Sequence, residues 1–205
     1  MNPTSTALRP DYLSIEQNLR FIKEPCRSAC LCLWHKYRKL FTNAPGATCN
    51  HQAWPGGYAD HVCEVLNYAR HLYQFDVTFG RPIGFELHDA MLVLFLHDIE
   101  KPFRLKWQAD GAIANVPALA SKSASCAFRE RLIKEAGILL TPPQQVALKY
   151  VEGEGADYSR ERRAMNELAA FCHKADVWSS RQCYNYPKAR NDEWTGALRH
   201  HGVEP

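Results

Sequence analysis

The feature that most constrains the fold of this chain is its longest uninterrupted apolar run, Ala90 to Leu96, which ends directly in His97 and Asp98. The segment 86–98 reads as a buried strand or a buried helix, and its length and its alanine, methionine and leucine content favour a helix. A carboxylate beside such a packed helix is costly, because burial disfavours its ionised form. Asp98 is therefore expected to have a compensating cation.

Most of the remaining chain also shows helical spacing of apolar residues. Further helices are expected from Tyr12 to about Leu40 with an interruption at Pro25, from a cap at Asp60 to about Tyr73, from about Ser125 to Ala136, from a cap at Thr141 to about Val151, and from Glu161 to about Arg181. Between Arg104 and Pro117, the dipeptide Asp110-Gly111 is typical of a tight hairpin. The prediction is an all-α, single-domain helical bundle over residues 1–205, with a core at about 12–181, one small β-hairpin flap and an irregular tail at about 185–205.

The composition of the chain limits the classes of ligand and macromolecule that it is expected to bind. The chain has 205 residues, of which 46% are hydrophobic, enough for one compact domain. A formal net charge of +3 is too weak a bias to indicate a nucleic-acid groove or a membrane-binding face, but it suits a small polyanionic ligand. With no signal peptide and no apolar run long enough to cross a bilayer, a cytoplasmic protein without membrane or specific nucleic-acid partners is expected, and a homo-oligomer stays open. The eight cysteines form no CxxC pair and are expected to be free thiols.

Four residues on three predicted helices form a pattern typical of a metal site: His61, His97, Asp98 and Asp176. Two neutral imidazoles and two carboxylates around a divalent cation give a formal charge near zero. Four ligands leave two octahedral positions for water and a phosphate oxygen. Mixed nitrogen and oxygen ligation suits Mn, Co, Fe, Ni or Zn better than Mg or Ca, so we expect one divalent ion of the first group.

The strings "GGYADHVCEVLNYARHLY", "MLVLFLHDIEKP" and "FCHKADVWSSR" carry this pattern, and over about Gly56 to Arg181 the chain resembles the HD-domain metal-dependent phosphohydrolases. The resemblance implies that the same four residues bind metal. Many members read His-Asp-Ile-Gly-Lys-Pro, so Lys101 matches the family lysine that contacts the scissile phosphate. Glu100 replaces the usual glycine and adds a carboxylate, which makes it a further candidate catalytic residue beside Lys101 and Asp98.

The small size and the lack of a sensor domain resemble the nucleotidase and deoxynucleoside triphosphohydrolase branches. The expected activity is hydrolysis of a dNTP or a dNMP by metal-activated water, with Arg104, His173 and Arg181 as candidate contacts to the phosphates. Those branches often carry a catalytic glutamate where this chain has Lys101, which puts a precise branch in doubt. A phosphodiesterase acting on a cyclic nucleotide or an alarmone, and a non-catalytic nucleotide-binding protein with the same scaffold, remain alternatives.

Other histidines and acids of the chain fit the metal-site pattern less well. His88-Asp89 is a second His-Asp pair, but it precedes His97 by two and a half helical turns, so it faces away and is expected to be a polar pair at the helix start. The remaining histidines, His51 among them, show no ligand pattern, and the paired histidines of two-metal members have no counterpart before Glu152. Glu152 and Glu154 are expected to be either an ordinary acidic loop or groups that support the metal ligands.

Overall fold

The structure is a computed structural model that describes residues 12–49 and 51–182, and it confirms the predicted all-α fold with one small antiparallel hairpin. The helices are α1 (Ile15–Leu19), α2 (Cys26–Phe41), α3 (Gly57–Thr78), α4 (Leu87–Leu96), α5 (Lys101–Arg104), α6 (Lys122–Glu135), α7 (Pro142–Tyr150) and α8 (Glu167–Gln182), with 3-10 turns at Pro117–Leu119 and Gly155–Asp157. The irregular tail expected at about 185–205 lies outside the described residues. No described helix is long and apolar enough to cross a bilayer.

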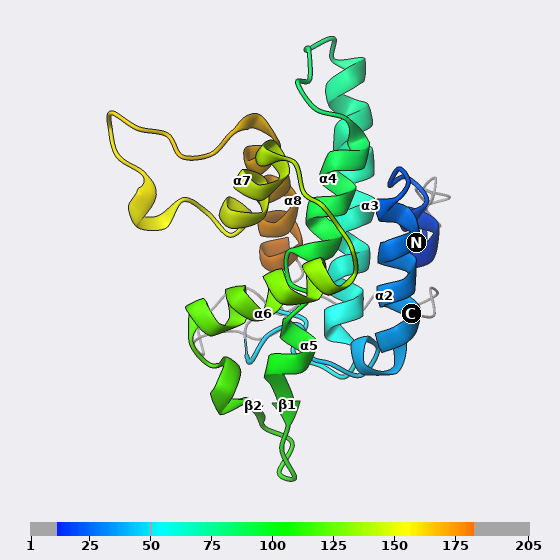
Figure 1. Ribbon diagram of the computed structural model, residues 1–205, viewed down its shortest axis with the longest axis vertical. Coiled ribbons are helices and arrows are strands. Elements are labelled where there is room, and N and C mark those ends of the chain that lie inside the picture. The colour runs from blue at the N-terminus through cyan, green and yellow to red at the C-terminus, as the bar shows by residue number, and fades with distance from the viewer. Residues whose placement is uncertain (1–11, 50, 183–205) are drawn as a thin grey trace, which may run out of the picture.

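The helix α4 lies at the centre of the bundle, in contact with α1, α3, α7 and α8 (Figure 1). Every residue of its apolar run, 90–96, is at most 1% exposed. This burial on all sides explains why the run has no polar face, and it confirms the helical interpretation of the segment. The helices α3 and α8 also contact each other, so α3, α4 and α8 meet as three neighbours.

The helix boundaries follow local capping chemistry. Ser14 and Thr141 each form a capping box at the start of α1 and α7, and Ser121 accepts a hydrogen bond from the Ala124 backbone at the start of α6. After α6, Gly137 adopts a φ of 73°, which favours glycine and ends the helix. These signals lie within a few residues of each helix end, which makes them readable from the sequence.

The hairpin forms where Asp110-Gly111 predicted it. Strand β1 (Leu105–Trp107) pairs antiparallel with β2 (Ile113–Asn115), and Gly111 has a φ of 81°. The hairpin projects from the lower end of the bundle, directly after α5 (Figure 1). It therefore extends from the short helix that follows His97 and Asp98.

Two predicted helix starts are wrong. The helix α3 begins at Gly57 after a left-handed Gly56, and Asp60 does not cap it but accepts a hydrogen bond of 2.6 Å from the Trp54 indole. The helix α8 begins at Glu167 instead of Glu161. Ahead of it, Glu154 Oε1 accepts hydrogen bonds from the backbone of residues 164 and 165, and Asn166 caps the helix by accepting a hydrogen bond of 2.8 Å from the Ala169 backbone.

Candidate metal centre

The junction of α3, α4 and α8 brings together the residues predicted to bind metal. His61 lies near the start of α3, His97 caps the C-terminus of α4 with Asp98 directly after it, and Asp176 lies in the middle of α8. His61 and His97 are fully buried, Asp98 is 1% exposed, and the Asp176 side chain is 15% exposed. The cluster is therefore closed on the core side and open only near Asp176.

The ligand atoms lie at separations that suit one shared ion. The Nε2 atoms of His61 and His97 are 3.3 Å apart, and Asp176 Oδ1 lies 3.2 Å and 3.6 Å from them. Asp98 Oδ2 lies 3.1 Å from His97 Nε2 and 3.5 Å from His61 Nε2. Two ligands that hold one ion at roughly 2.1 Å lie about 3.0–3.4 Å from each other. The cluster thus has the dimensions of a coordination sphere.

Hydrogen bonds on the outer side of each ring fix which nitrogen faces the cluster. His97 Nδ1 donates to the Leu94 carbonyl at 2.7 Å, which leaves a lone pair on Nε2 of the neutral ring. His61 Nδ1 lies 3.0 Å from Ser179 Oγ, and the Ser179 hydroxyl donates to Glu64 Oε2 at 2.9 Å. Because that hydroxyl hydrogen is used on Glu64, Ser179 accepts from His61 Nδ1, and Nε2 of His61 also carries a lone pair. Such outer partners orient histidine ligands in metalloproteins.

The electrostatics of the cluster favour a cation between these groups. Burial by itself lowers the pKa of His97, but the carboxylates of Asp98 and Asp176 outweigh it and raise that pKa to about 10. Burial opposes ionisation of both acids as well, yet His97 and Lys101 bring the pKa of Asp98 well below its usual range, and hydrogen bonds from His61 and His97 lower the pKa of Asp176. The two acids thus attract positive charge to the point where the imidazoles meet, which a divalent cation supplies when it replaces the proton on His97.

Asp98 supplies the most direct test of whether a metal fits. Its Oδ1 atom is inaccessible to solvent and has no hydrogen-bond donor. Its Oδ2 atom contacts the two imidazoles and the Lys101 ammonium, which lies 2.5 Å away. Buried charges are normally paired, hydrogen-bonded or bound to a metal, so the free Oδ1 and the two facing imidazoles fit a divalent cation.

Three of the four predicted ligands form a compact group: one ligand atom each from His61, His97 and Asp176 lies within 4.8 Å of the others. Asp98 is not part of that group, although its Oδ2 contacts both imidazoles. The donor set of imidazole nitrogen and carboxylate oxygen is unchanged from the sequence prediction, and it suits a first-row transition ion. The identity of the metal and the role of Asp98 as a ligand remain predictions.

The sequence reasoning missed His51, which lies beside the cluster with its ring centroid 5.1 Å from that of His61. Its Nδ1 lies 2.5 Å from Gln52 Oε1, and Gln52 Nε2 donates to Glu64 at 2.7 Å and to Ser179 at 3.2 Å. The buried Gln52 amide therefore holds both His51 and Ser179, the hydrogen-bond partner of His61. Burial, followed by the positive charge of its neighbours, lowers the pKa of His51 to about 3. No local motif marks this residue.

The loop that carries His51 is held by close backbone packing. Gln52 is fully buried with a φ of 42°, and its carbonyl accepts a hydrogen bond of 2.9 Å from the Gly46 backbone. A Cβ at Gly57 would overlap that same carbonyl. The glycines at 46 and 57 thus allow the loop to lie against the start of α3, where His61 follows within one turn.

Of the three predicted catalytic residues, Asp98 belongs to the cluster, while Glu100 and Lys101 lie at the start of α5 in different surroundings. Lys101 contacts Asp98, which outweighs burial and raises the pKa of the ammonium. Glu100 is 5% exposed, and burial with the nearby Asp98 raises its pKa to about 7. Arg129 of α6 braces the turn between α4 and α5 by donating from Nη1 to the His97 carbonyl at 2.5 Å.

The predicted substrate contacts are not gathered in one place. Arg104 lies in the last turn of α5 and lines a cavity next to the cluster. His173 is half-buried, and its Nδ1 donates to the Val151 carbonyl at 2.7 Å, so it joins α8 to the end of α7. Arg181 is exposed in the last turn of α8. Glu152 forms an ion pair of 3.3 Å with Lys122.

Comparisons with known proteins leave the family of this chain open. No protein-family model, no curated protein and no solved structure matches it. The features that bear on function are therefore the chemistry of the cluster and the motifs that carry it.

Proposed function

We propose that this chain is a metal-dependent phosphohydrolase that acts on a nucleotide, with a dNTP or a dNMP as the preferred substrate. The observation that carries the proposal is the convergence of His61, His97, Asp98 and Asp176 in one cluster, in which the buried Oδ1 atom of Asp98 has no hydrogen-bond donor. The resemblance of the motifs to those of HD-domain phosphohydrolases supports the same activity.

Charge supports an anionic substrate. Asp98 and Asp176 together carry two negative charges, which a divalent cation balances. Lys101, whose ammonium lies 2.5 Å from Asp98, then adds one positive charge beside the cluster. A phosphate ester is drawn to such a site, and a fixed ammonium stabilises the negative charge that develops on the phosphoryl oxygens during hydrolysis.

Each residue has a separate task in this scheme. His61, His97, Asp98 and Asp176 hold the metal, which when bound supplies a Lewis acid and an activated water. Ser179 and the Leu94 carbonyl keep both imidazoles turned toward the cluster. Lys101 binds the phosphoryl group, and the brace from Arg129 to the His97 carbonyl holds the turn on which Lys101 lies.

Metal analysis of the purified protein, followed by phosphate release from a panel of dNTPs and dNMPs with added Mn or Co, tests the proposal. Inorganic phosphate from a dNMP identifies a nucleotidase, whereas triphosphate from a dNTP identifies a triphosphohydrolase. Asp98→Ala is the negative control and Asp89→Ala, in the other His-Asp pair, is the matched positive control. If metal is bound but no panel member is hydrolysed, the hydrolase proposal fails and a binding protein is favoured.

A further inference from the structure

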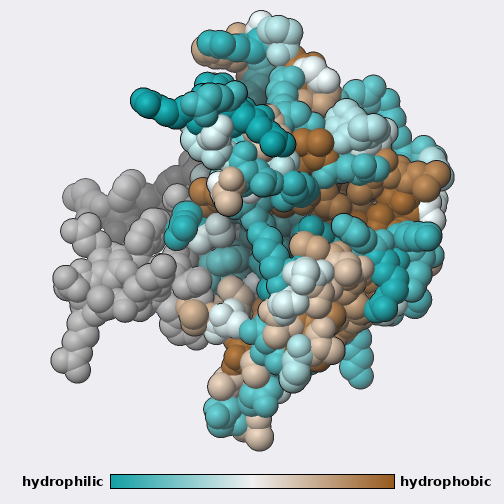
Figure 2. Space-filling view, turned by 60° about the vertical axis from the view of Figure 1, so that its left-hand side comes forward, coloured by the Kyte–Doolittle hydropathy of each residue, from teal (hydrophilic) through white to brown (hydrophobic). Residues whose placement is uncertain are grey.

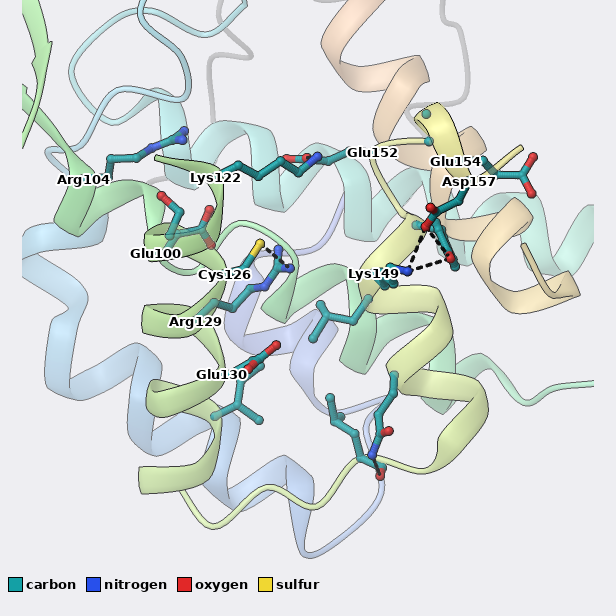
Figure 3. Close-up of a pocket in the computed structure, with 18 of the residues that line it drawn as sticks. Glu100, Arg104, Lys122, Cys126, Arg129, Glu130, Lys149, Glu152, Glu154 and Asp157 are labelled. Atoms are coloured by element: carbon teal, nitrogen blue, oxygen red, sulfur yellow. Dashed lines mark hydrogen bonds and ion pairs between the residues drawn. The ribbon is translucent and has the colours of Figure 1, made fainter. Parts of the chain in front are cut away.

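A cavity of about 1020 Å³ lies between α6, α7 and the segment that follows α7 (Figure 3). Sites for small molecules commonly measure about 300–1,000 Å³, so this one holds a ligand as large as a nucleotide. Figure 2 shows one face of the molecule, on which hydrophilic residues alternate with hydrophobic patches. None of the metal-binding candidates lines the cavity.

The cavity nevertheless borders the metal centre on two sides. Glu100 lines it from the turn that carries His97 and Asp98, and Arg129, another lining residue, donates to the His97 carbonyl. On the opposite side, Gly153 lines it so close to α8 that an added Cβ would lie 3.6 Å from His173 Cε1, one helical turn before Asp176. The cavity and the metal centre therefore share the turn that carries His97, Asp98 and Glu100.

Three polar atoms of the cavity wall are buried without a hydrogen-bond partner: Glu100 Oε2, Arg104 Nε and Arg129 Nε. Figure 3 shows these three residues on the same side of the cavity, on α5, α6 and the turn before α5, across from Lys149 and Asp157. Buried polar groups in proteins are nearly always hydrogen-bonded. A ligand that satisfies all three must offer a donor to the carboxylate and acceptors to the two guanidinium groups.

The rest of the wall excludes a purely anionic ligand. The described lining residues include five basic and five acidic side chains, namely Arg104, Lys122, Arg129, Lys134 and Lys149 against Glu100, Glu130, Glu152, Glu154 and Asp157. Their formal charges cancel, so the cavity has no net attraction for a polyphosphate. Ile133, Ile138 and Leu148 add a buried apolar portion that hydrates poorly and suits a flat hydrophobic ring.

We propose that this cavity is the subsite for the nucleoside part of the substrate, an inference that rests on the proposed function. Glu100 accepts hydrogen bonds from sugar hydroxyl or base N–H groups, and Arg104 and Arg129 donate to ring oxygen, carbonyl or ring nitrogen atoms. The base lies against Ile133 and Leu148, and the phosphate extends toward Lys101. A nucleoside offers both donors and acceptors on a neutral frame, which a free phosphate or a short phosphorylated acid does not.

Binding of unphosphorylated nucleosides to the full chain in the presence of a chelator tests this without any turnover. The probes are adenosine, guanosine, cytidine and thymidine, and isothermal titration calorimetry measures their binding. Ribose 5-phosphate, which has a phosphate but no base, is the comparison ligand. Cys126 lines the cavity, so a second readout is its alkylation by iodoacetamide, followed peptide by peptide. The exposed Cys32, on α2 away from the cavity, is the internal reference. At least one nucleoside should bind and should slow alkylation of Cys126 but not of Cys32.

Glu100→Gln should weaken binding of that nucleoside by about 10- to 100-fold, as expected for loss of a hydrogen bond to a buried charged group. Glu135→Gln, on the exposed side of α6, is the matched control and should bind as the unaltered chain does. Ile133→Trp fills the apolar portion and should abolish binding and protection of Cys126 without changing metal content. Circular dichroism shows which variants are folded.

The outcomes separate this inference from the proposed function. If a nucleoside binds in a Glu100-dependent way but no nucleotide is hydrolysed, the subsite stands and the hydrolase proposal fails. If nucleotides are hydrolysed but no nucleoside binds or protects Cys126, the subsite is overturned. Equal affinities of the Glu100→Gln and Glu135→Gln variants would overturn it as well.

Discussion

The helix α4 carries a His-Asp pair at each end, and the same two residue types have different environments there. In the first turn, Asp89 accepts hydrogen bonds from the Glu86 backbone at 2.9 Å and from Gln144 Nε2 at 2.7 Å, while His88 Nδ1 accepts from the Lys23 backbone at 3.0 Å. At the C-terminal end, Asp98 accepts no hydrogen bond from the backbone of α4: its Oδ1 has no donor, and its Oδ2 contacts the imidazoles and the Lys101 ammonium.

The helix itself explains much of this difference. The N-terminus of a helix presents free N–H groups and a partial positive charge, so an aspartate there is capped and stabilised. The C-terminus presents carbonyl groups and a partial negative charge, so Asp98 gains nothing from α4 and depends on cations from elsewhere. A His-Asp pair thus becomes a metal site through its position on the helix and the elements packed against it.

The largest expected effect comes from removing the aspartate of the C-terminal pair. Asp98→Ala should abolish metal binding and phosphate release while leaving helicity unchanged, because it deletes the charged group that contacts both imidazoles. Metal analysis and circular dichroism measure the two properties. Unchanged metal content would show that Asp98 is no ligand and that the two pairs differ less than we argue.

Lys101→Met separates the metal ligands from the phosphate contact. Turnover should fall about 10²- to 10³-fold, as when one fixed group that stabilises transition-state charge is removed. Metal affinity should stay the same or rise, since the ammonium no longer competes for Asp98 Oδ2. Lys106→Met, on an exposed neighbouring lysine, is the control. Loss of metal from the Lys101 variant would show that its role is misassigned.

Ser179→Ala tests whether the hydrogen bond on the outer side of the His61 ring contributes to metal affinity. Removing the hydroxyl that accepts from His61 should weaken metal binding about 10- to 100-fold, measured by competition with a chelator. Ser180→Ala, whose hydroxyl donates only to the Val177 carbonyl, should leave the affinity unchanged. Equal affinities for the two variants would mean that His61 is oriented by packing alone.

The number of protons released on metal binding reports the charge of the His97 imidazole in the metal centre. Because the carboxylates raise the pKa of His97 to about 10, this imidazole holds a proton at neutral pH, and a metal must displace it. Binding should release about one proton per ion, and affinity should rise about tenfold per pH unit up to pH 10. Calorimetry in buffers of different ionisation enthalpy measures the release. Binding without proton release would contradict the assigned charge state.

The smallest effect is expected at the N-terminal pair. Asp89→Ala should lower the free energy of unfolding by about 1–2 kcal/mol through loss of the cap and of the Gln144 partner. Denaturant unfolding measures this. Metal content should not change, and a loss of metal would show that the two pairs are not independent.

The parts of the fold that were predictable depend on neighbouring residues. The apolar run of α4, the capping box at Thr141 and the hairpin at Asp110-Gly111 each determine local structure within a few positions, and the structure agrees. The convergence of His61, His97 and Asp176 was predictable because each lies near or within a helix whose apolar face must turn toward the same core.

The parts that were missed depend on contacts between distant segments. The start of α8 is the exception, since Asn166 accepts a hydrogen bond from the Ala169 backbone and so caps the helix within three residues. His51 reaches the cluster only because Gln52 adopts an unusual backbone conformation and bonds to Glu64 and Ser179. The cavity is formed by the packing of α6 and α7 around Glu100, which no periodicity describes.

Because Gly57 lies so close to the Gln52 carbonyl, the arrangement of the whole metal centre depends on a glycine at position 57. Any larger residue there displaces the loop, and with it the amide that supports both His51 and the Ser179 partner of His61. A saturation library at this codon should therefore yield almost only glycine among active clones, even though the residue never touches metal or substrate.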